Sequence, residues 1–335
     1  MPELSFAPTV ERAYGALVAT GTLKQEPEHF RVDEILGFTP EGRGEHVWLH
    51  LEKRDTNTQF VADGLARVFD VPRSAVGYAG MKDRRAVTRQ WFSVYFPGRK
   101  TPLLRDLDRA LECDVNVVGT TRSARKLRIG AHRGNHFDIR ITQFETVDVR
   151  RLTAQLSAIA QTGVPNAFGA QRFGYECANL HAAAAWFDGG RKPRTRNVRS
   201  FALSAARAWI FNQVLHERIR ARSWQSCLVG EWATRNEDGS AAPTGPLVGR
   251  GRTRAAGLAR ALEDEVIRNH ASWVAGLERA GLNLERRRLI SEPINCRWHC
   301  DTKRRELRLR FGLRRGEFAT ALLVHCVDTE VRSPQ

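Results

Sequence analysis

The chain lacks the segments that would send it to a membrane or out of the cell. Its opening residues, MPELSFAPTV, show no basic start followed by a long apolar run. No later segment offers the roughly 18 consecutive apolar residues of a membrane helix. The cations are dispersed through the chain, and no basic amphipathic helix or lipidation motif is evident. We therefore expect a cytoplasmic protein that does not bind a membrane.

Cysteine is scarce, with 6 residues in a chain of 335. The one local group of soft ligands is Cys296, His299 and Cys300, with His325 and Cys326 further along. Zinc sites usually show paired Cys-x-x-Cys or His spacings, and these residues do not. We expect reduced, buried thiols and a core histidine, and no metal site.

Glycine-rich phosphate loops are also missing. Gly77, Gly80 and Lys82 resemble such a loop only faintly, because the motif needs four residues between its glycines and a Ser or Thr after the Lys. Here two residues intervene and Asp83 follows. No Gly-rich loop follows an N-terminal strand, which disfavours a methyltransferase. The two glycines are instead expected to let backbone or substrate approach where a side chain would block it.

Acidic residues are outnumbered, with 37 Asp and Glu against 53 Lys and Arg. The formal net charge is +16 and the sequence pI is about 10.4. A charge of this sign and size is typical of proteins that bind polyanions, and nucleic acid is the leading candidate. The length and a hydrophobic content of 42% allow two domains, or one large domain with an insertion.

The hydrophobic pattern changes along the chain. Apolar residues alternate in 30–36 and again in 45–53, which predicts a hairpin or a longer strand pair. Helical spacing follows Asn57 and ends at Pro72. From Val149 onward helical periods dominate, with long patterns over 201–222 and 254–281.

Strand patterns return after Arg288. Alternation in ELRLRF predicts one strand, and the nearly continuous apolar run FATALLVHCV, residues 318–327, predicts a central strand. Strand-rich ends around a helix-rich middle predict one α+β domain interrupted by an insertion.

One carboxylate, Asp83, lies among the cations Lys82, Arg84, Arg85 and Arg89 just before a strand-like run. Neighbouring cations favour the ionised form of an acid, so the stretch predicts an anionic catalyst on a loop. Lys82 or Arg85 would orient the carboxylate or contact phosphate, and spacing alone does not choose between these roles. The other interpretation is a solvated charge cluster in a turn.

The stretch around Asp83 is part of an ordered series of motifs, of which the strongest is AGMKDRRAVTRQ at residues 79–90. It is accompanied in order by FRVDEILGF, GRGEHVWLHLEKRDTNT, RGNHFDIRI, GVPNAFGAQRFG, SFALSAARAWIFN, TGPLVG, ERRRLI and GEFATALL. This ordered series closely resembles the motifs of the TruD family of tRNA pseudouridine synthases. Each motif alone is weak, but their joint order is specific and disfavours a mere charge cluster at Asp83.

The resemblance implies an α+β protein with the pseudouridine synthase catalytic fold, a mixed and mostly antiparallel sheet flanked by helices. The catalytic domain would comprise residues 1–155 and 286–335, with a helix-rich insertion over 156–285. It also implies isomerisation of uridine to pseudouridine, at position 13 in the dihydrouridine arm of tRNA(Glu). The expected partner is tRNA, and the protein would act as a monomer without cofactor or metal.

The resemblance also assigns site residues. Asp83 falls on the catalytic aspartate, which would attack either C6 of the base or C1′ of the ribose. Phe30, Asn135 and Phe318 fall on substrate-contacting positions, where aromatic rings would stack on the base and the amide would read its edge. From the residues alone, core packing of the two rings and turn chemistry at Asn135 remain alternatives.

The chain departs locally from the family pattern. Ala167 stands where an aromatic residue is common, and His325 with Cys326 replaces an Arg-Glu pair. A rival function is a basic tRNA-binding protein or RNA chaperone that performs no chemistry, in which case Asp83 is a turn residue.

Overall fold

The computed structural model describes residues 6, 11–102, 104–236 and 238–331. Most of the opening stretch, in which we expected no targeting signal, lies outside the described residues. Among the described residues, no helix combines the length and apolar character needed to cross a bilayer.

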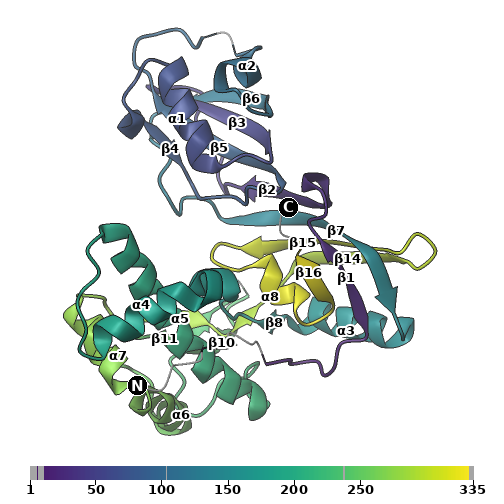
Figure 1. The fold of residues 1–335 in the computed structure, drawn as a ribbon, viewed down its shortest axis with the longest axis vertical. Helices are drawn as coiled ribbons and strands as arrows, with labels where there is room; N and C mark the ends of the chain where they lie inside the picture. Colours follow the sequence, from purple (N-terminus) through teal and green to yellow (C-terminus); the bar gives the residue numbers. More distant parts are fainter. Residues whose placement is uncertain (1–5, 7–10, 103, 237, 332–335) are drawn as a thin grey trace. The chain divides into compact units, whose positions relative to one another are not determined.

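The chain forms two compact units, each built from separate segments of sequence (Figure 1). Unit 1 comprises Met1–Leu17, Ser157–Glu292 and Phe318–Cys326; unit 2 comprises Val18–Leu156, Pro293–Glu317 and Val327–Gln335. The boundaries of a catalytic domain and an insertion stay a prediction, because compactness alone does not tell which unit carries out the chemistry.

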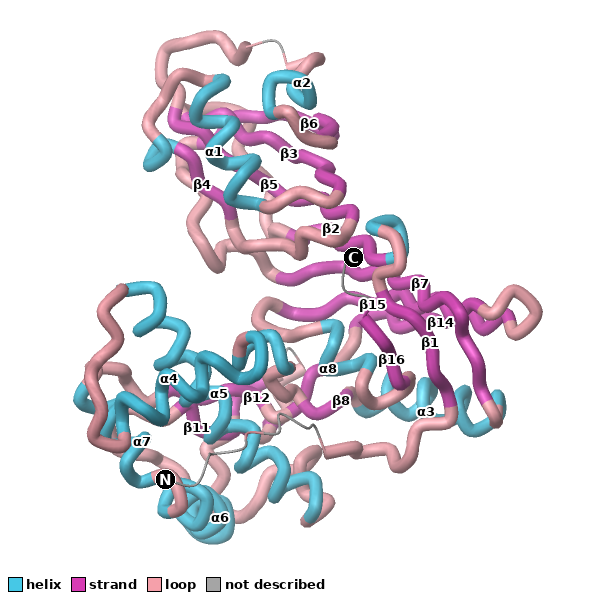
Figure 2. Tube along the Cα trace, in the orientation of Figure 1, coloured by secondary structure: helices cyan, strands magenta, loops and turns pink. Residues whose placement is uncertain are grey.

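Unit 2 is organised around one mixed sheet (Figure 2). Its main path runs through β14 (Ile294–Asp301), β15 (Glu306–Arg314), β7 (Gly134–Thr146), β2 (Phe30–Ile35), β5 (Val87–Tyr95), β3 (His46–Arg54) and β6 (Val115–Ser123). Beside this path, β1 (Ala19–Leu23) pairs with β7 and β16 (Asp328–Val331), and β4 (Val76–Tyr78) pairs with β5. Only the β1–β16 and β2–β5 pairs within the described sheet are parallel.

The register of this sheet separates an apolar face from a charged one. Phe30 is paired with Ile139 on one face, whereas Arg31 is paired with Asp138 on the other. On the apolar face, α1 (Thr58–Val68) packs against β3 and β5 in one hydrophobic cluster. As the sequence predicts, Asn57 begins this helix, and its side chain accepts a hydrogen bond from the backbone N–H of Gln59.

The predicted pairing of the first two strands is wrong. Residues 30–35 and 46–54 are strands, but β5 lies between them, parallel to β2 and antiparallel to β3. Alternation of apolar residues reports that one face of a strand is buried and carries no information about its neighbours. The strand β5, which lies beside β2 in the sheet, follows it in the chain only after some fifty residues.

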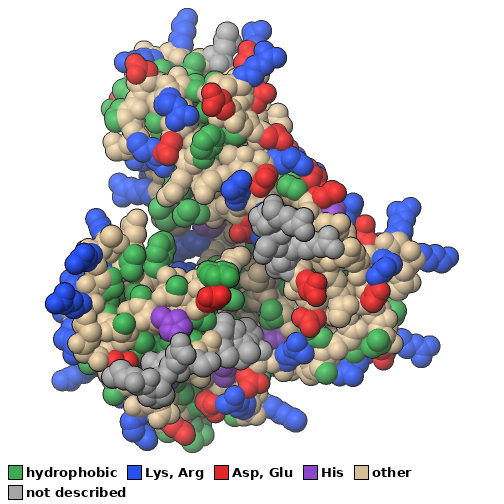
Figure 3. All heavy atoms as spheres, viewed as in Figure 1, with side chains coloured by type: hydrophobic (Ala, Val, Ile, Leu, Met, Phe, Trp, Pro, Cys, Tyr) green, Lys and Arg blue, Asp and Glu red, His purple; other side chains and the backbone are tan. Residues whose placement is uncertain are grey.

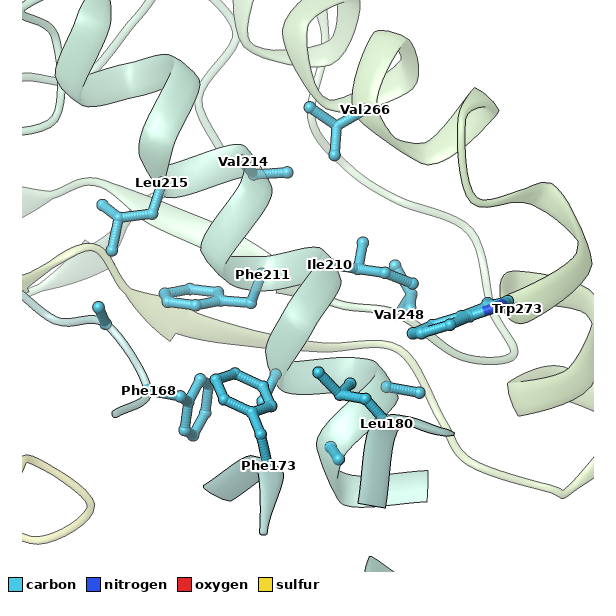
Figure 4. Close-up of a cluster of buried hydrophobic side chains, with 14 of the residues drawn as sticks. Phe168, Phe173, Leu180, Ile210, Phe211, Val214, Leu215, Val248, Val266 and Trp273 are labelled. Carbon is cyan, nitrogen blue, oxygen red and sulfur yellow. The ribbon is translucent and has the colours of Figure 1, made fainter. Parts of the chain in front are cut away.

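Unit 1 is mainly helical. Its helices are the end of α3 (Val149–Thr162), α4 (Ala178–Phe187), α5 (Arg196–Arg220), α6 (Gly257–Arg268), α7 (Ala271–Arg279) and α8 (Ala319–Leu323). Short strand pairs accompany them: β8 (Val164–Pro165) with β13 (Ile290–Ser291), β9 (Thr234–Arg235) with β10 (Ala241–Ala242), and β11 (Thr244–Leu247) with β12 (Glu285–Arg288). Figure 4 shows the core, in which Phe211 and Ile210 of α5 face Phe168, Phe173 and Leu180.

Two sequence predictions for unit 1 need correction. The apolar run 318–327 contains the helix α8 instead of a central strand, since its Ala and Leu residues are strong helix formers and short apolar runs fit a buried helix equally well. The helical pattern over 254–281 is two helices, because α6 ends at Arg268 and α7 begins at Ala271.

The core histidine expected from the sequence is His325, which is 1% exposed in unit 1. Its Nδ1 accepts a 3.4 Å hydrogen bond from the backbone N–H of Ala13, and the ring of Tyr14 lies edge-on to it. Burial, reinforced by the charge of Arg12, lowers the pKa of His325 to about 4. The folded protein therefore holds this ring neutral.

We expect His325 to make the protein less stable in acid. In the unfolded chain the imidazole binds a proton below its ordinary pKa of about 6.5, while in the folded chain it does so only near pH 4. Stability is therefore lost as the pH falls from about 6.5 to about 4, by roughly 2 to 3 kcal/mol. Urea unfolding at pH 7.5 and pH 4.5 should show a smaller difference for His325→Met than for the unmodified protein. An equal difference in both would contradict this account.

Candidate active site

The loop that carries Asp83 connects β4 to β5 and is held by a closed set of hydrogen bonds. The backbone N–H of Lys82 donates to the hydroxyl of Thr58 at 3.1 Å, and that hydroxyl donates to Oε1 of Gln90 at 3.0 Å. The other end of the Gln90 amide donates to the carbonyl of Gly80 at 3.2 Å. Residues before and after the loop thus fix its backbone.

The side chain of Lys82 also anchors this loop, through an ion pair. Its Nζ lies 2.7 Å from Oε2 of Glu34, and both side chains are buried. The second carboxylate oxygen of Glu34 accepts a hydrogen bond from the backbone N–H of Trp91. Lys82 was one of two sequence candidates to orient Asp83, but it pairs with Glu34. Breaking a buried pair of this kind costs about 3 to 5 kcal/mol.

The carboxylate of Asp83 is paired with Lys24. Lys24 Nζ lies 2.9 Å from Asp83 Oδ2, in a pair that spans 59 positions of sequence. The same Nζ is 4.0 Å from the centre of the Phe30 ring, so the cation lies between the carboxylate and the aromatic face. Lys24 has φ of 56°, a conformation that is costly outside glycine and often marks a functional position.

The backbone of Asp83 is held by a second lysine. Lys53 is fully buried, and its Nζ donates to the carbonyls of Thr56 at 2.6 Å and of Asp83 at 3.1 Å. Burial lowers the pKa of Lys53 to about 8, although the nearby charge of Asp83 opposes the shift. Lys24 therefore holds the carboxylate of Asp83 and Lys53 holds its main chain, while the Asp83 side chain remains 39% exposed.

The other loop residues from the sequence analysis also contact protein. Arg85 donates to the backbone carbonyl of Gln25 at 3.2 Å, next to Lys24. A Cβ added at Gly77 would lie 2.2 Å from the carbonyl oxygen of Leu127. The missing side chain at Gly77 therefore permits a close approach of two backbone segments.

Phe30 and Asn135 lie on the same face of the sheet. Phe30 is 2% exposed, and its ring packs edge-on against Phe137 at 6.1 Å. It forms a floor under Lys24. Asn135 is paired in register with Glu34, and its Oδ1 is buried without a hydrogen-bond partner among the described residues. A buried acceptor left in this state is costly unless a bound molecule supplies a donor.

Phe318 belongs to unit 1, whereas Asp83, Phe30 and Asn135 belong to unit 2. It directly precedes α8, with its ring centre 6.2 Å from that of Phe168. The guanidinium of Arg287 is 5.9 Å from the Phe318 ring. The structure thus gathers Asp83 and Phe30 around Lys24, places Asn135 on the same sheet face, and places Phe318 in a separate environment.

Sequence reasoning missed Lys24 and Lys53. Neither lysine is at a spacing from Asp83 that local structure explains, because both reach it through the order of strands in the sheet. Lys53 did lie within the quoted stretch GRGEHVWLHLEKRDTNT. A lysine at an inward-facing position of an alternating strand is the signal that could have identified it.

The cysteines are not gathered with other metal-binding side chains: among the described residues, no three His, Cys, Asp or Glu side chains are grouped to bind a metal ion. Cys296 and Cys300 are half-buried on β14, and His299 between them is exposed. Burial raises the pKa of the Cys296 thiol to about 11, which keeps it protonated.

Comparison with known proteins identifies the family. The sequence profile described as tRNA pseudouridine synthase D (TruD) matches residues 14–187. The chain is 42% identical to the tRNA pseudouridine synthase D of Pseudomonas entomophila over 336 aligned residues, covering 95% of this chain and 94% of that protein. It is also 42% identical to the protein of that name from Nitrosococcus oceani, over 342 residues and with the same coverage.

A solved structure supports the fold. The crystal structure of a TruD protein from Methanosarcina mazei superimposes with a TM-score of 0.70 at 20% identity, covering 95% of this chain and 96% of that one. The predicted α+β pseudouridine synthase fold is thereby confirmed. With relatives that align over nearly its whole length, the chain belongs to the TruD family of tRNA pseudouridine synthases.

Proposed function

We propose that this tRNA pseudouridine synthase uses Asp83 as its nucleophile and acts on uridine 13 in the dihydrouridine arm of tRNA(Glu). The observation that carries the assignment of Asp83 is its ion pair with Lys24, 2.9 Å long, on a loop held at its backbone from both sides. The choice of tRNA and position rests on the family resemblance.

The reaction breaks the bond from ribose C1′ to N1 of uracil, turns the base, and forms a bond from C1′ to C5. If Asp83 attacks C1′, its oxygen bonds to that carbon as the uracil leaves with the electron pair; C5 then displaces the carboxylate and loses its proton. If it attacks C6, its oxygen bonds to that carbon as the C5=C6 double bond opens. The bond from C1′ to N1 then breaks, the turned base bonds to C1′ through C5, and loss of the C5 proton restores the double bond as the carboxylate leaves C6. In either route the nucleophile is the ionised carboxylate.

Asn135 is proposed to hold the base during its rotation. Its buried, unpartnered Oδ1 is an acceptor suited to the N3–H group of uracil. The buried ring of Phe30 packs against the ammonium group of Lys24 and so helps to fix its position. Phe318 is proposed to contact the RNA from unit 1.

Changing Asp83 to Asn should abolish pseudouridine formation on a tRNA(Glu) transcript while the transcript still binds, because the amide is nearly isosteric and cannot act as a nucleophile. Product is measured by chemical mapping of pseudouridine, and binding by filter retention. Pseudouridine formed at the normal rate by the variant would refute the role of Asp83. Wild-type binding without any product would favour the non-catalytic RNA chaperone.

Changing Lys24 to Met should lower kcat by about 100-fold, the loss typical of a reacting group misplaced by about 1 Å. The tRNA Kd should change little, because the lysine is largely buried beside Asp83. Single-turnover kinetics measure the effect. Lys100→Met, which removes an exposed cation from unit 2, is the matched control. Equal rates for the two variants would contradict the proposed orientation of Asp83.

Affinity for tRNA should fall steeply with salt. Lys and Arg side chains are spread over the visible surface in Figure 3 instead of forming one patch, so several phosphates can be neutralised at once. Four phosphate contacts would weaken binding by about 100-fold between 50 and 200 mM salt. Fluorescence anisotropy with labelled tRNA at several salt concentrations measures the slope, and a flat profile would contradict an electrostatic interface.

A further inference from the structure

Unit 1 contains a pocket that none of the proposed chemistry uses. It lies where the end of α4, the first turns of α5 and the end of α7 meet (Figure 1), and its volume is about 220 Å³. This is smaller than the sites that hold drug-sized ligands, so the pocket suits one ring or one phosphate group. The lining residues used below are Trp186, Phe187, Lys192, Arg199, Gly276 and Arg279.

One wall of the pocket is a basic linker that joins α4 to α5. The sequence contains no acidic residue from Gly189 to His216. A Cβ added at Gly190 would collide with the carbonyl oxygen of Ala185, so a glycine is needed where the linker turns back against α4. The guanidinium of Arg199 then donates to two carbonyl oxygens of the linker, those of Pro193 at 3.1 Å and Arg194 at 2.9 Å. The basic segment is therefore held in one place on unit 1.

The cations of the pocket have no acidic partner. Among the described residues, no carboxylate forms an ion pair with Lys192, Arg199 or Arg279, and none of the lining residues is acidic. The neighbouring acid Asp188 is not part of the lining, and its carboxylate accepts a 2.8 Å hydrogen bond from the hydroxyl of Ser272. Like charges gathered without a counter-ion repel one another. A bound phosphate would remove this repulsion.

An indole ring lies beside these cations. Trp186 is half-buried, and its ring centre is 5.1 Å from that of Phe187. Phe187 is in turn fixed by α7, because a Cβ at Gly276 would overlap its ring. The position of Trp186 is thus determined by the core of unit 1, while part of its ring remains in the pocket. A fixed aromatic ring next to unpaired cations is the arrangement that stacks a nucleic acid base and binds its phosphates.

We propose that this pocket is a docking site for the RNA substrate. One unstacked base lies against Trp186, adjacent phosphates are bound by Lys192 and Arg279, and Arg199 holds the linker that presents Lys192. RNA is favoured over an acidic peptide because the indole and the cations occur together. The inference rests on the proposed function, since it takes the RNA substrate as the ligand. None of these residues belongs to the Asp83 loop or to the set proposed to hold the reacting uridine, so the site contributes affinity and not chemistry.

The phosphate contacts are tested by salt dependence. Binding of a tRNA(Glu) transcript is measured by anisotropy in the Asp83→Asn background. The double variant Lys192→Gln/Arg279→Gln should bind more weakly and reduce the slope of log K against log salt by about two, one for each phosphate. The matched control Arg252→Gln/Arg268→Gln removes two exposed cations of unit 1 outside the pocket. It should keep the slope of the parent.

The stacking contact is tested at Trp186. Trp186→Leu keeps an apolar side chain against the core but removes the ring, so binding should weaken by at least about 5-fold, the lower end for one lost base stack, with the salt slope unchanged. Trp186→Phe retains a ring and should recover most of the affinity. Leu258→Ala, which truncates an exposed apolar residue of α6, should bind as the parent does. Thermal melting of every variant checks that unit 1 is folded.

The outcomes separate this inference from the proposed function. If the pocket variants bind tRNA as tightly as the controls, the pocket is not a docking site, whatever the wild-type activity. With Asp83 intact, the variants should reach the wild-type single-turnover rate at saturating enzyme; a reduced rate with normal affinity would place the reacting uridine here and overturn the inference. A wild type that binds the transcript without forming pseudouridine would refute the proposed function alone, because the binding assay does not depend on catalysis.

Discussion

The ion pair between Lys24 and Asp83 depends on a single feature of the sheet, the parallel pairing of β2 with β5. Parallel neighbours bring the starts of both strands to the same edge, and in the register Arg31 is opposite Val87. Lys24 precedes β2 and Asp83 precedes β5 by only a few residues. Segments 59 positions apart therefore meet at 2.9 Å. An antiparallel hairpin of β2 with β3 would have left the carboxylate without this cation.

Two lysines beside Asp83, Lys53 and Lys82, have buried side chains, and burial of an ammonium group is costly. Removing an ammonium from water is unfavourable unless other groups replace its solvation. Backbone carbonyls do so for Lys53, and Glu34 does so for Lys82. Because such interactions add little net stability, their value lies in the single conformation they impose on the loop. The positive φ of Lys24 agrees with this view, since the cost of that backbone conformation is accepted where the side chain must reach Asp83.

The sequence could predict the features that depend on neighbouring residues, but not those that depend on contacts between distant parts of the chain. Alternation located the strands at 30–35 and 46–54, and Asn57 located the start of α1, because these features depend on neighbouring residues. Strand pairing and the partner of Asp83 depend on contacts made elsewhere in the chain, and local patterns do not contain them. The helix in 318–327 was missed for another reason, because a short apolar run fits a buried strand and a buried helix equally well. Asp83 could be singled out as a candidate site residue because its motif consists of neighbouring residues. Lys24 was not, since no motif links it to Asp83.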